Sequence, residues 1–175
     1  HVQLGGLLRV FDYHETGVGD AHYAPTGGVN VSSVLKVIPD TNVKFCALYG
    51  TGIGGYVVDF GSVSKKERKD FYLENDKDIT PKPIDSWGGF AGIERRWFPK
   101  VRSTFAYGYI HTTDELKRGG NSFQQGHFVS TSLTYHPTEQ LSFGLEYLYG
   151  HRTLIADRND QKDAHRIQAA LKFSL

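Results

Sequence analysis

Alternation of apolar and polar positions is the main pattern along this chain, and it is typical of β-strands with two different faces. It is most regular at the C-terminal end, where one side of residues 166–175 carries Ile167, Ala169, Leu171, Phe173 and Leu175. One side of residues 141–150 likewise carries Leu141, Phe143, Leu145, Tyr147 and Tyr149. Almost no segment has the spacing of an amphipathic helix. The pattern therefore predicts an all-β protein.

Eight strands are predicted, and together they form a single domain over residues 1–175. Their expected ranges are 2–13, 28–38, 42–58, 86–98, 100–113, 124–136, 141–150 and 166–175. The first strand alternates less regularly than the others, because Leu7 and Phe11 share a side with Arg9.

Short and long connections alternate between these strands. Short turns fall near residues 39–41, 98–100 and 137–139, and long polar loops at 14–27, 59–85, 114–123 and 154–164. This order predicts an antiparallel, up-and-down transmembrane β-barrel with short periplasmic turns and long extracellular loops. The loop 59–85 either folds into the pore as a constriction or lies in solvent outside it. Its basic run offers contacts to lipopolysaccharide phosphates through Lys65, Lys66, Arg68 and Lys69.

Aromatic residues fall near both ends of the predicted strands, as expected for girdles at the two membrane interfaces. Trp97, Tyr135, Phe143 and Phe173 lie near the short turns, and Tyr13, Tyr56, Trp87, Tyr109 and Tyr149 near the long loops. The outward positions between the two bands carry one charge, Arg95, which lies two residues from Trp97 and reaches the interface from there.

Composition excludes several other classes of protein. The longest run that contains no Asp, Glu, Lys, Arg or His, residues 45–58, is interrupted by glycines and is shorter than the roughly 20 apolar residues of a membrane-spanning helix. The net charge of +1 gives no reason to expect a nucleic-acid partner. The single cysteine, Cys46, cannot form an internal disulfide.

The glycine run GTGIGG at 50–55 has the spacing of a dinucleotide-binding fingerprint, which requires a helix at its last glycine. Tyr56, Val57 and Val58 follow it and disfavour a helix. We therefore expect a strand whose bare face accommodates a loop or a neighbouring subunit, and no cofactor. The histidines are scattered without the close pairing of metal ligands, and no serine is set beside a histidine base, so neither a metal site nor an enzyme is predicted.

Several stretches resemble the DcaP-like outer-membrane porins. They are LGGLLR at 4–9, YGTGIGGY at 49–56, ERRWFPKVRSTFAYGY at 94–109, GLEYLYG at 144–150 and DAHRIQ at 163–168. The resemblance covers nearly the whole chain but only the C-terminal half of the family's usual length. It implies a trimeric, sixteen-stranded barrel that passes small organic anions through a pore lined by arginines and lysines. The final residue, Leu175, departs from the aromatic with which outer-membrane proteins usually end.

Strand parity places a set of charged residues on the predicted lumen face. The cations are Arg9, Lys36, Lys44, Arg96, Arg102, Arg152, Arg166 and Lys172, and the acids are Glu94 and Glu146. A wall rich in cations lowers the barrier for anions and raises it for cations. Local pairing, for example of Arg96 with Glu94, would neutralise part of this charge, but a positive excess would remain.

The predicted function is therefore an outer-membrane porin of a Gram-negative cell that gives passive passage to small, preferentially anionic solutes such as organic acids. Its expected partners are outer-membrane lipid and lipopolysaccharide, with two further copies in a homotrimer. Two alternatives stay open. One is a small closed eight-stranded barrel with a structural or adhesive role. The other is a soluble ligand-binding β-barrel, which would need no detergent.

Overall fold

The computed structural model describes residues 1–14, 21–56, 70–73, 81–113, 122–155 and 162–174. Eight long strands form its main sheet: β1 (Val2–His14), β2 (Ala21–Ile38), β3 (Thr41–Thr51), β6 (Asp85–Phe98), β7 (Val101–Thr112), β8 (Phe123–Tyr135), β9 (Leu141–Leu154) and β10 (Lys162–Phe173). The short strands β4 (Phe71–Leu73) and β5 (Pro81–Pro83) pair in a second sheet, and a 3-10 helix, η1, spans Gly54–Tyr56. Among the described residues no helix has the length and apolar character needed to cross a membrane.

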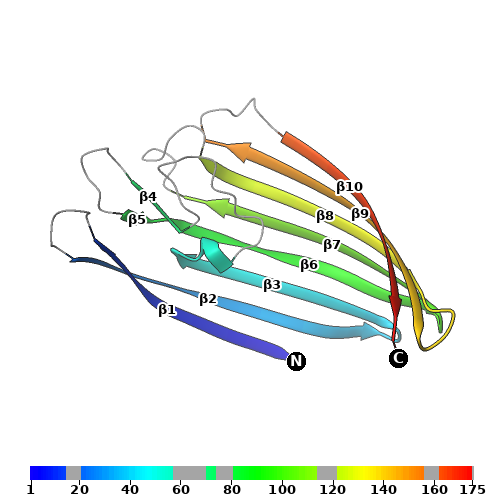
Figure 1. Cartoon of the computed structure of the whole chain (residues 1–175). Helices are drawn as coiled ribbons and strands as arrows, with labels where there is room; N and C mark the ends of the chain where they lie inside the picture. The colour runs from blue at the N-terminus through cyan, green and yellow to red at the C-terminus, as the bar shows by residue number, and fades with distance from the viewer. Residues whose placement is uncertain (15–20, 57–69, 74–80, 114–121, 156–161, 175) are drawn as a thin grey trace.

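The main sheet is an antiparallel meander in which each strand lies beside its neighbours in the chain (Figure 1). The spatial order is β1-β2-β3-β6-β7-β8-β9-β10, so β1 and β10 are the edge strands. Within the part of the chain that is described, each of these two edges pairs with a single strand. The predicted all-β fold and the eight antiparallel strands of its main sheet are thus confirmed. The described residues form an open sheet with two edges, so closure into a barrel stays a prediction.

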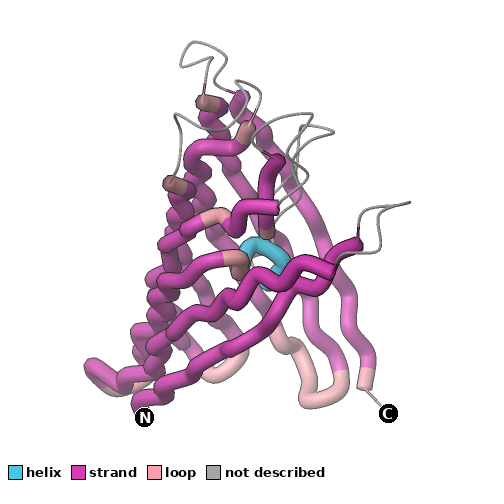
Figure 2. The backbone as a smooth tube through the Cα atoms, turned by 90° about the vertical axis from the view of Figure 1, so that its left-hand side faces the viewer, coloured by secondary structure: helices cyan, strands magenta, loops and turns pink. Residues whose placement is uncertain are grey.

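The sheet bends so that one of its faces is concave, and η1 lies inside the curve (Figure 2). Both chain ends lie at the end of the sheet that carries the short turns (Figure 1). One of these turns contains Asp40, whose φ of 61° is a conformation that aspartate tolerates better than most residues. The first strand therefore leads away from the short turns and the last strand returns to them, as the alternation of connections predicts.

Pairing register divides the side chains between the two faces of the sheet. Arg96 lies opposite Arg102, Glu94 opposite Asn42, and the same alternation continues from β1 to β10. Bulge-like register shifts occur near strand ends in β2, β6 and β8. Even-numbered residues of the main strands β2 to β10, together with odd-numbered residues of β1, occupy the concave face. Their neighbours occupy the outer face.

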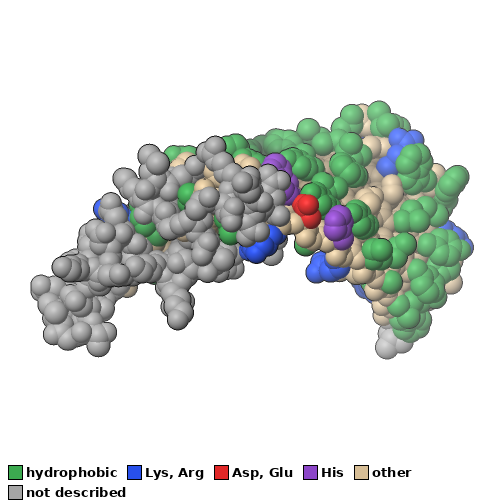
Figure 3. All heavy atoms as spheres, turned by 90° about the horizontal axis from the view of Figure 1, so that it is seen from above, with side chains coloured by type: hydrophobic (Ala, Val, Ile, Leu, Met, Phe, Trp, Pro, Cys, Tyr) green, Lys and Arg blue, Asp and Glu red, His purple; other side chains and the backbone are tan. Residues whose placement is uncertain are grey.

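The outer face is apolar and exposed. Leu8 is 93% exposed, Leu4 83% and Ile167 74%. Hydrophobic side chains cover much of the surface that is described in the view from above (Figure 3). At the short-turn end the guanidinium carbon of Arg95 lies 4.7 Å from the ring centroid of Trp97, the arrangement expected for a charge that reaches a membrane interface. An apolar face of this extent requires a lipid or protein cover.

Several strand ends differ from the sequence-based expectation. β3 ends at Thr51 and not at 58, because Gly52 turns the chain with a φ of 65°. β2 begins at Ala21, inside the loop expected at 14–27, since pairing with β1 continues through Pro25 and Gly27. β10 likewise begins at Lys162, and the segment 59–85 contains the unexpected strands β4 and β5.

A small core lies between the concave face and three described pieces of the chain, residues 52–56, 70–73 and 81–84, here called the inner shelf. Ile53 is 6% exposed, Tyr72 4% and Ile84 0%. Tyr72 and Ile84 pack with Ile110 of β7 and Phe123 of β8. The inner shelf is therefore fixed to the wall by buried apolar side chains, on the side where the sheet is hollow.

Gly50 permits close approach of sheet and shelf, and its substitution tests this packing. A Cβ at Gly50 would lie 2.5 Å from the carbonyl oxygen of Gly27 and 3.0 Å from Cγ2 of Ile53, whereas at Gly150 nothing lies within 4 Å. We expect Gly50→Ala to lower the free energy of unfolding by about 1–3 kcal/mol, and Gly150→Ala to leave it nearly unchanged. Urea unfolding in detergent, followed by tryptophan fluorescence, measures both; equal effects would contradict the close packing.

Candidate functional site: the charged concave face

The ten charged residues expected in the lumen lie on one face of the sheet by register, and this face is the concave one. Representative pairs are Arg9 opposite Thr26, Lys36 opposite Asn42, and Arg166 opposite Leu148. The full set on this face is Arg9, Lys36, Lys44, Glu94, Arg96, Arg102, Glu146, Arg152, Arg166 and Lys172. A solute inside the curve of the sheet would meet these side chains.

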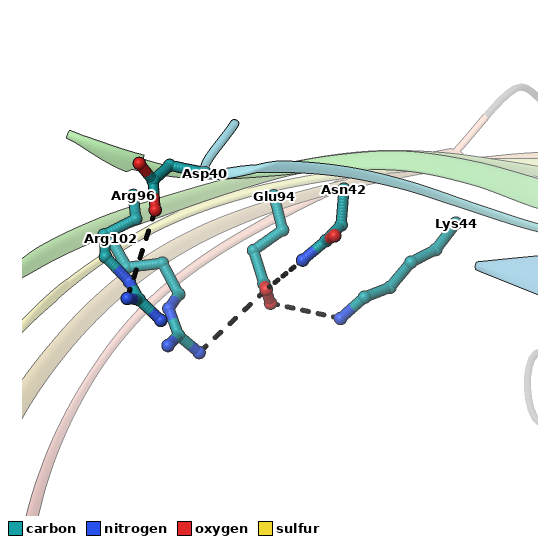
Figure 4. Close-up of polar contacts among 6 residues, drawn as sticks. All are labelled: Asp40, Asn42, Lys44, Glu94, Arg96 and Arg102. Carbon is teal, nitrogen blue, oxygen red and sulfur yellow. Dashed lines mark hydrogen bonds and ion pairs between the residues drawn. The ribbon is translucent and has the colours of Figure 1, made fainter. Parts of the chain in front are cut away.

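Glu94 is the centre of a polar network near the short-turn end (Figure 4). Its carboxylate accepts hydrogen bonds from Lys44 Nζ at 3.1 Å and Asn42 Nδ2 at 3.4 Å, and Arg102 Nη1 lies 4.0 Å away. These side chains come from three adjacent strands and point to the same side. Because all of them are partly exposed, the attractions are modest, but the network holds one acid between two cations.

Arg96 and Glu146 have different partners from those of Glu94. Arg96 Nη1 lies 4.0 Å from Asp40 Oδ1 in the β2–β3 turn, so the anticipated pairing of Arg96 with Glu94 is replaced by this contact. Glu146 accepts hydrogen bonds from neutral donors, Ser130 Oγ at 2.5 Å and Gln168 Nε2. Both predicted acids of the face are therefore held in place by their neighbours.

Four cations of the face stand apart from any carboxylate. Across the described ranges, no Asp or Glu oxygen lies within ion-pair distance of Lys36, Arg152, Arg166 or Lys172. An unpaired cation in a recess exerts its full attraction on a passing anion, reduced only by solvent and salt. These residues carry most of the positive excess of the concave face.

A weakly polar band separates the charges at the two ends of the face. Phe90 and Phe128 each lie opposite Gly108, and Leu48 lies opposite Gly88, one step farther from the short turns. Together with Tyr56 of the inner shelf they line a hollow of about 800 Å³. Arg152 and Lys162 border the same hollow and lie opposite each other on β9 and β10. Sequence analysis missed Lys162 because it placed this residue in a loop.

An array of tyrosines and histidines crosses the outer face near the ends of β7 to β10. Tyr107 Oη lies 2.7 Å from His127 Nδ1, and Tyr147 Oη lies 2.7 Å from His165 Nδ1. The His127 and His151 rings are 5.8 Å apart, and His151 Nδ1 lies 2.8 Å from Asp163. His127 and His151, which look unrelated in the sequence, are thus neighbours, and His111 joins them through the ring of Tyr109. His165 lies against Tyr147 and Tyr149. In the described segments, however, no three His, Cys, Asp or Glu residues are arranged to hold a metal ion.

The aromatic residues near the long loops follow the expected girdle only in part. Trp87 and Tyr109 contact each other on the outer face, with ring centroids 5.2 Å apart. Tyr56 instead lies on the concave side, where its ring centroid is 5.7 Å from the guanidinium carbon of Arg9. Tyr56 is not part of the aromatic girdle because β3 ends at Thr51, five residues before it in the chain. The side chain of Tyr13 lies outside the described atoms.

Comparison with known proteins identifies the fold. No family model and no curated protein sequence matches the chain. A solved structure does match: the outer membrane channel DcaP of Acinetobacter baumannii, with a TM-score of 0.74 and 17% sequence identity over 99% of this chain. The sheet of this chain therefore has the same fold as part of that channel. It spans 47% of the length of the DcaP chain, about half of that channel.

The match agrees with the resemblance seen in the sequence, and it extends that resemblance from short motifs to the whole sheet. The matching structure is described as an outer membrane channel. At this level of identity the similarity defines the arrangement of strands.

Proposed function

We propose that this chain forms part of an outer-membrane porin that gives passive passage to small, preferentially anionic solutes such as organic acids. The observation that carries this proposal is the cation-rich concave face of a sheet with the fold of an outer-membrane channel wall. Selectivity then arises from electrostatic attraction by the unpaired arginines and lysines, combined with exclusion by size. No cofactor takes part.

The two free edges support a larger barrel around this wall. In a bilayer every backbone polar group needs a partner, so β1 and β10 must each gain a second neighbour, and in a larger barrel further strands supply it. β1 leads away from the short-turn end and β10 returns to it, so an even number of additional strands joins them without breaking the antiparallel pattern. We propose a barrel of about 16 strands, assembled as a homotrimer in the outer membrane of a Gram-negative cell.

Lipid and lipopolysaccharide are the proposed surroundings of the outer face. The exposed apolar side chains between the two aromatic bands match hydrocarbon, and the bands match the interfaces on either side. The tyrosine–histidine array lies at the end of the sheet away from the short turns, where headgroup-level hydrogen bonding is available. The basic residues Lys65, Lys66, Arg68 and Lys69 lie outside the described residues.

Two other functions remain as alternatives, and each makes a different prediction. A closed eight-stranded barrel would need β1 to pair with β10, would have an interior filled by side chains, and would carry no current. A soluble ligand-binding barrel would remain dispersed without detergent. The open hollow on the concave face and the exposed apolar outer face favour the porin over both.

Glu94→Gln tests the electrostatic part of the proposal. The substitution removes a negative charge from the concave face and releases Lys44 and Arg102 from their partner. A unit charge about 8 Å from a permeating ion changes its energy by about 0.5 kcal/mol in water, with opposite sign for chloride and potassium, so the chloride-to-potassium permeability ratio should rise about five-fold. Reversal potentials of the full-length protein in planar bilayers under a KCl gradient measure this ratio.

Glu139→Gln is the matched control, because it makes the same change of charge in the exposed β8–β9 turn. It should leave the reversal potential nearly unchanged. A permeability ratio that stays constant in Glu94→Gln, or that moves equally in both variants, would mean that the concave face does not line the ion path.

A further inference from the structure

Arg9 has contacts that differ from those of the other cations on the concave face. Its Nη1 lies 3.5 Å from Asp70 Oδ2 and donates to the carbonyl oxygen of Gly52 at 3.5 Å. Its guanidinium carbon is 4.0 Å from the ring centroid of Phe11 and also faces the ring of Tyr56. One side chain of β1 therefore touches two separate pieces of the inner shelf.

Asp70 connects the remaining pieces of the shelf. Its side-chain oxygen Oδ1 accepts a hydrogen bond from the backbone N–H of Gly55 at 2.6 Å, and its carbonyl accepts one from Ile84 at 2.9 Å. Ile84 in turn accepts a hydrogen bond from Gly52 at 2.9 Å. With only 18% of its side chain exposed, Asp70 has most of its polar surface committed to these partners.

The shelf lies over the wall where the pore would run. Cγ2 of Ile53 is 3.0 Å from the position of a Cβ on Gly28 or Gly50, both on the concave face, and the Phe11 and Phe71 rings pack edge to face at 5.8 Å. Tyr56 of the shelf borders the same hollow as Phe90 and Arg152. The inner shelf therefore reduces the open cross-section on the concave side of the sheet.

We propose that Arg9 and Asp70 form a latch that holds the inner shelf against the wall, so that the shelf narrows the passage. Arg9 is then a positioning residue, and its charge is used within the protein instead of attracting solute. The latch itself is a claim about structure; only its effect on current rests on the proposed channel function.

The single variants Arg9→Gln and Asp70→Asn, and the double variant, test the latch in the full-length protein. Residue-resolved hydrogen exchange in detergent should show the Gly52 and Gly55 amides exchanging about ten-fold faster or more in each variant, because the shelf opens more often when the contacts of Arg9 or of the Asp70 carboxylate are lost. Single-channel conductance should rise in both single variants, and the double variant should resemble either one.

Lys172→Gln is the control, since it removes a cation of the same face from the far end of β10, where the shelf makes no described contact. It should leave exchange at Gly52 and Gly55 unchanged.

If Arg9 instead attracts solute directly, Arg9→Gln and Asp70→Asn will shift the reversal potential in opposite directions while the exchange rates of Gly52 and Gly55 stay unchanged. That result would refute the latch. Exchange decides the latch even where no current is seen, whereas a silent wild-type protein refutes the channel function. Heat-modifiable gel mobility verifies that each variant is folded.

Discussion

Arginine in place of Phe105 should destabilise the protein in a bilayer by about 2–4 kcal/mol, the cost of this side chain near the midplane on the lipid face of a barrel. Phe105 lies in the middle of β7, on the outer face opposite Ile93 and Thr131, and is 52% exposed. No aqueous surface is near this position if the outer face contacts hydrocarbon. Urea unfolding in liposomes gives the free energy, and heat-modifiable mobility gives the fraction that inserts.

Thr104→Arg is the matched control, because Thr104 is the preceding residue and lies on the concave face opposite Glu94 and Ser132. Arginine there would meet water and a carboxylate, so we expect little loss of stability. Equal tolerance of both variants, with a folded protein that needs no detergent, would mean that the outer face is in water. The soluble alternative would then be preferred.

Reversing the charge of Arg152 and Arg166 together should turn the preference for anions into one for cations. Both lie on the concave face, and neither has a carboxylate within ion-pair distance among the described residues. The double change to glutamate alters the local charge by four units, or about 2 kcal/mol for an ion roughly 8 Å away. The sign is opposite for chloride and potassium, so the permeability ratio should change by about 4 kcal/mol, or about a thousand-fold before screening by salt. Reversal potentials at low and high KCl measure the shift and its screening.

Lys100→Glu provides the comparison for this reversal. Lys100 lies in the exposed β6–β7 turn, where its Nζ donates to the carbonyl oxygen of Pro137 at 2.7 Å. Because Lys100 lies outside the concave face, reversing its charge should change the permeability ratio little. If Lys100→Glu matched the double variant, selectivity would arise from the net charge of the protein and not from the wall of the pore.

Alternation was sufficient to predict the strands, because one face of the sheet is apolar and the other is mostly polar. The alternation is irregular in β1, and the structure explains this exception. In β1, Leu7 and Phe11 share the concave face with Arg9, which makes the pattern irregular in the sequence. The structure gives the reason: the inner shelf packs on this part of the wall, with Phe71 against Phe11, so the concave face is apolar there as well.

The inner shelf itself could not be predicted from local patterns. Its hydrogen bonds join Gly52 to Ile84 and Gly55 to Asp70, and its ion pair joins Asp70 to Arg9. These residues are far apart in the sequence, and their spacing follows no period of a helix or strand. The glycine run did contain a usable signal, since a bare strand face predicts close approach of another segment, and Ile53 occupies that space above Gly28 and Gly50.

The ion pairs between strands could not be predicted, because they depend on strand register, and the alternation pattern does not determine register to within one residue. A one-residue error in a strand start changes every cross-strand partner. Glu94 therefore contacts Lys44 and Arg102, while Arg96 contacts Asp40. The same dependence explains why the histidine neighbours His127 and His151, which lie directly opposite each other on β8 and β9, seemed unrelated in the sequence.

The proposed anion-selective pore is tested most simply by the reversal potential of the full-length protein in a planar bilayer that separates two KCl concentrations. A cation-rich concave face inside an outer-membrane barrel predicts discrete single-channel steps and a reversal potential displaced toward the chloride equilibrium value. Discrete steps displaced toward the potassium value would contradict the role of the arginines and lysines. A bilayer that stays silent would contradict the channel itself.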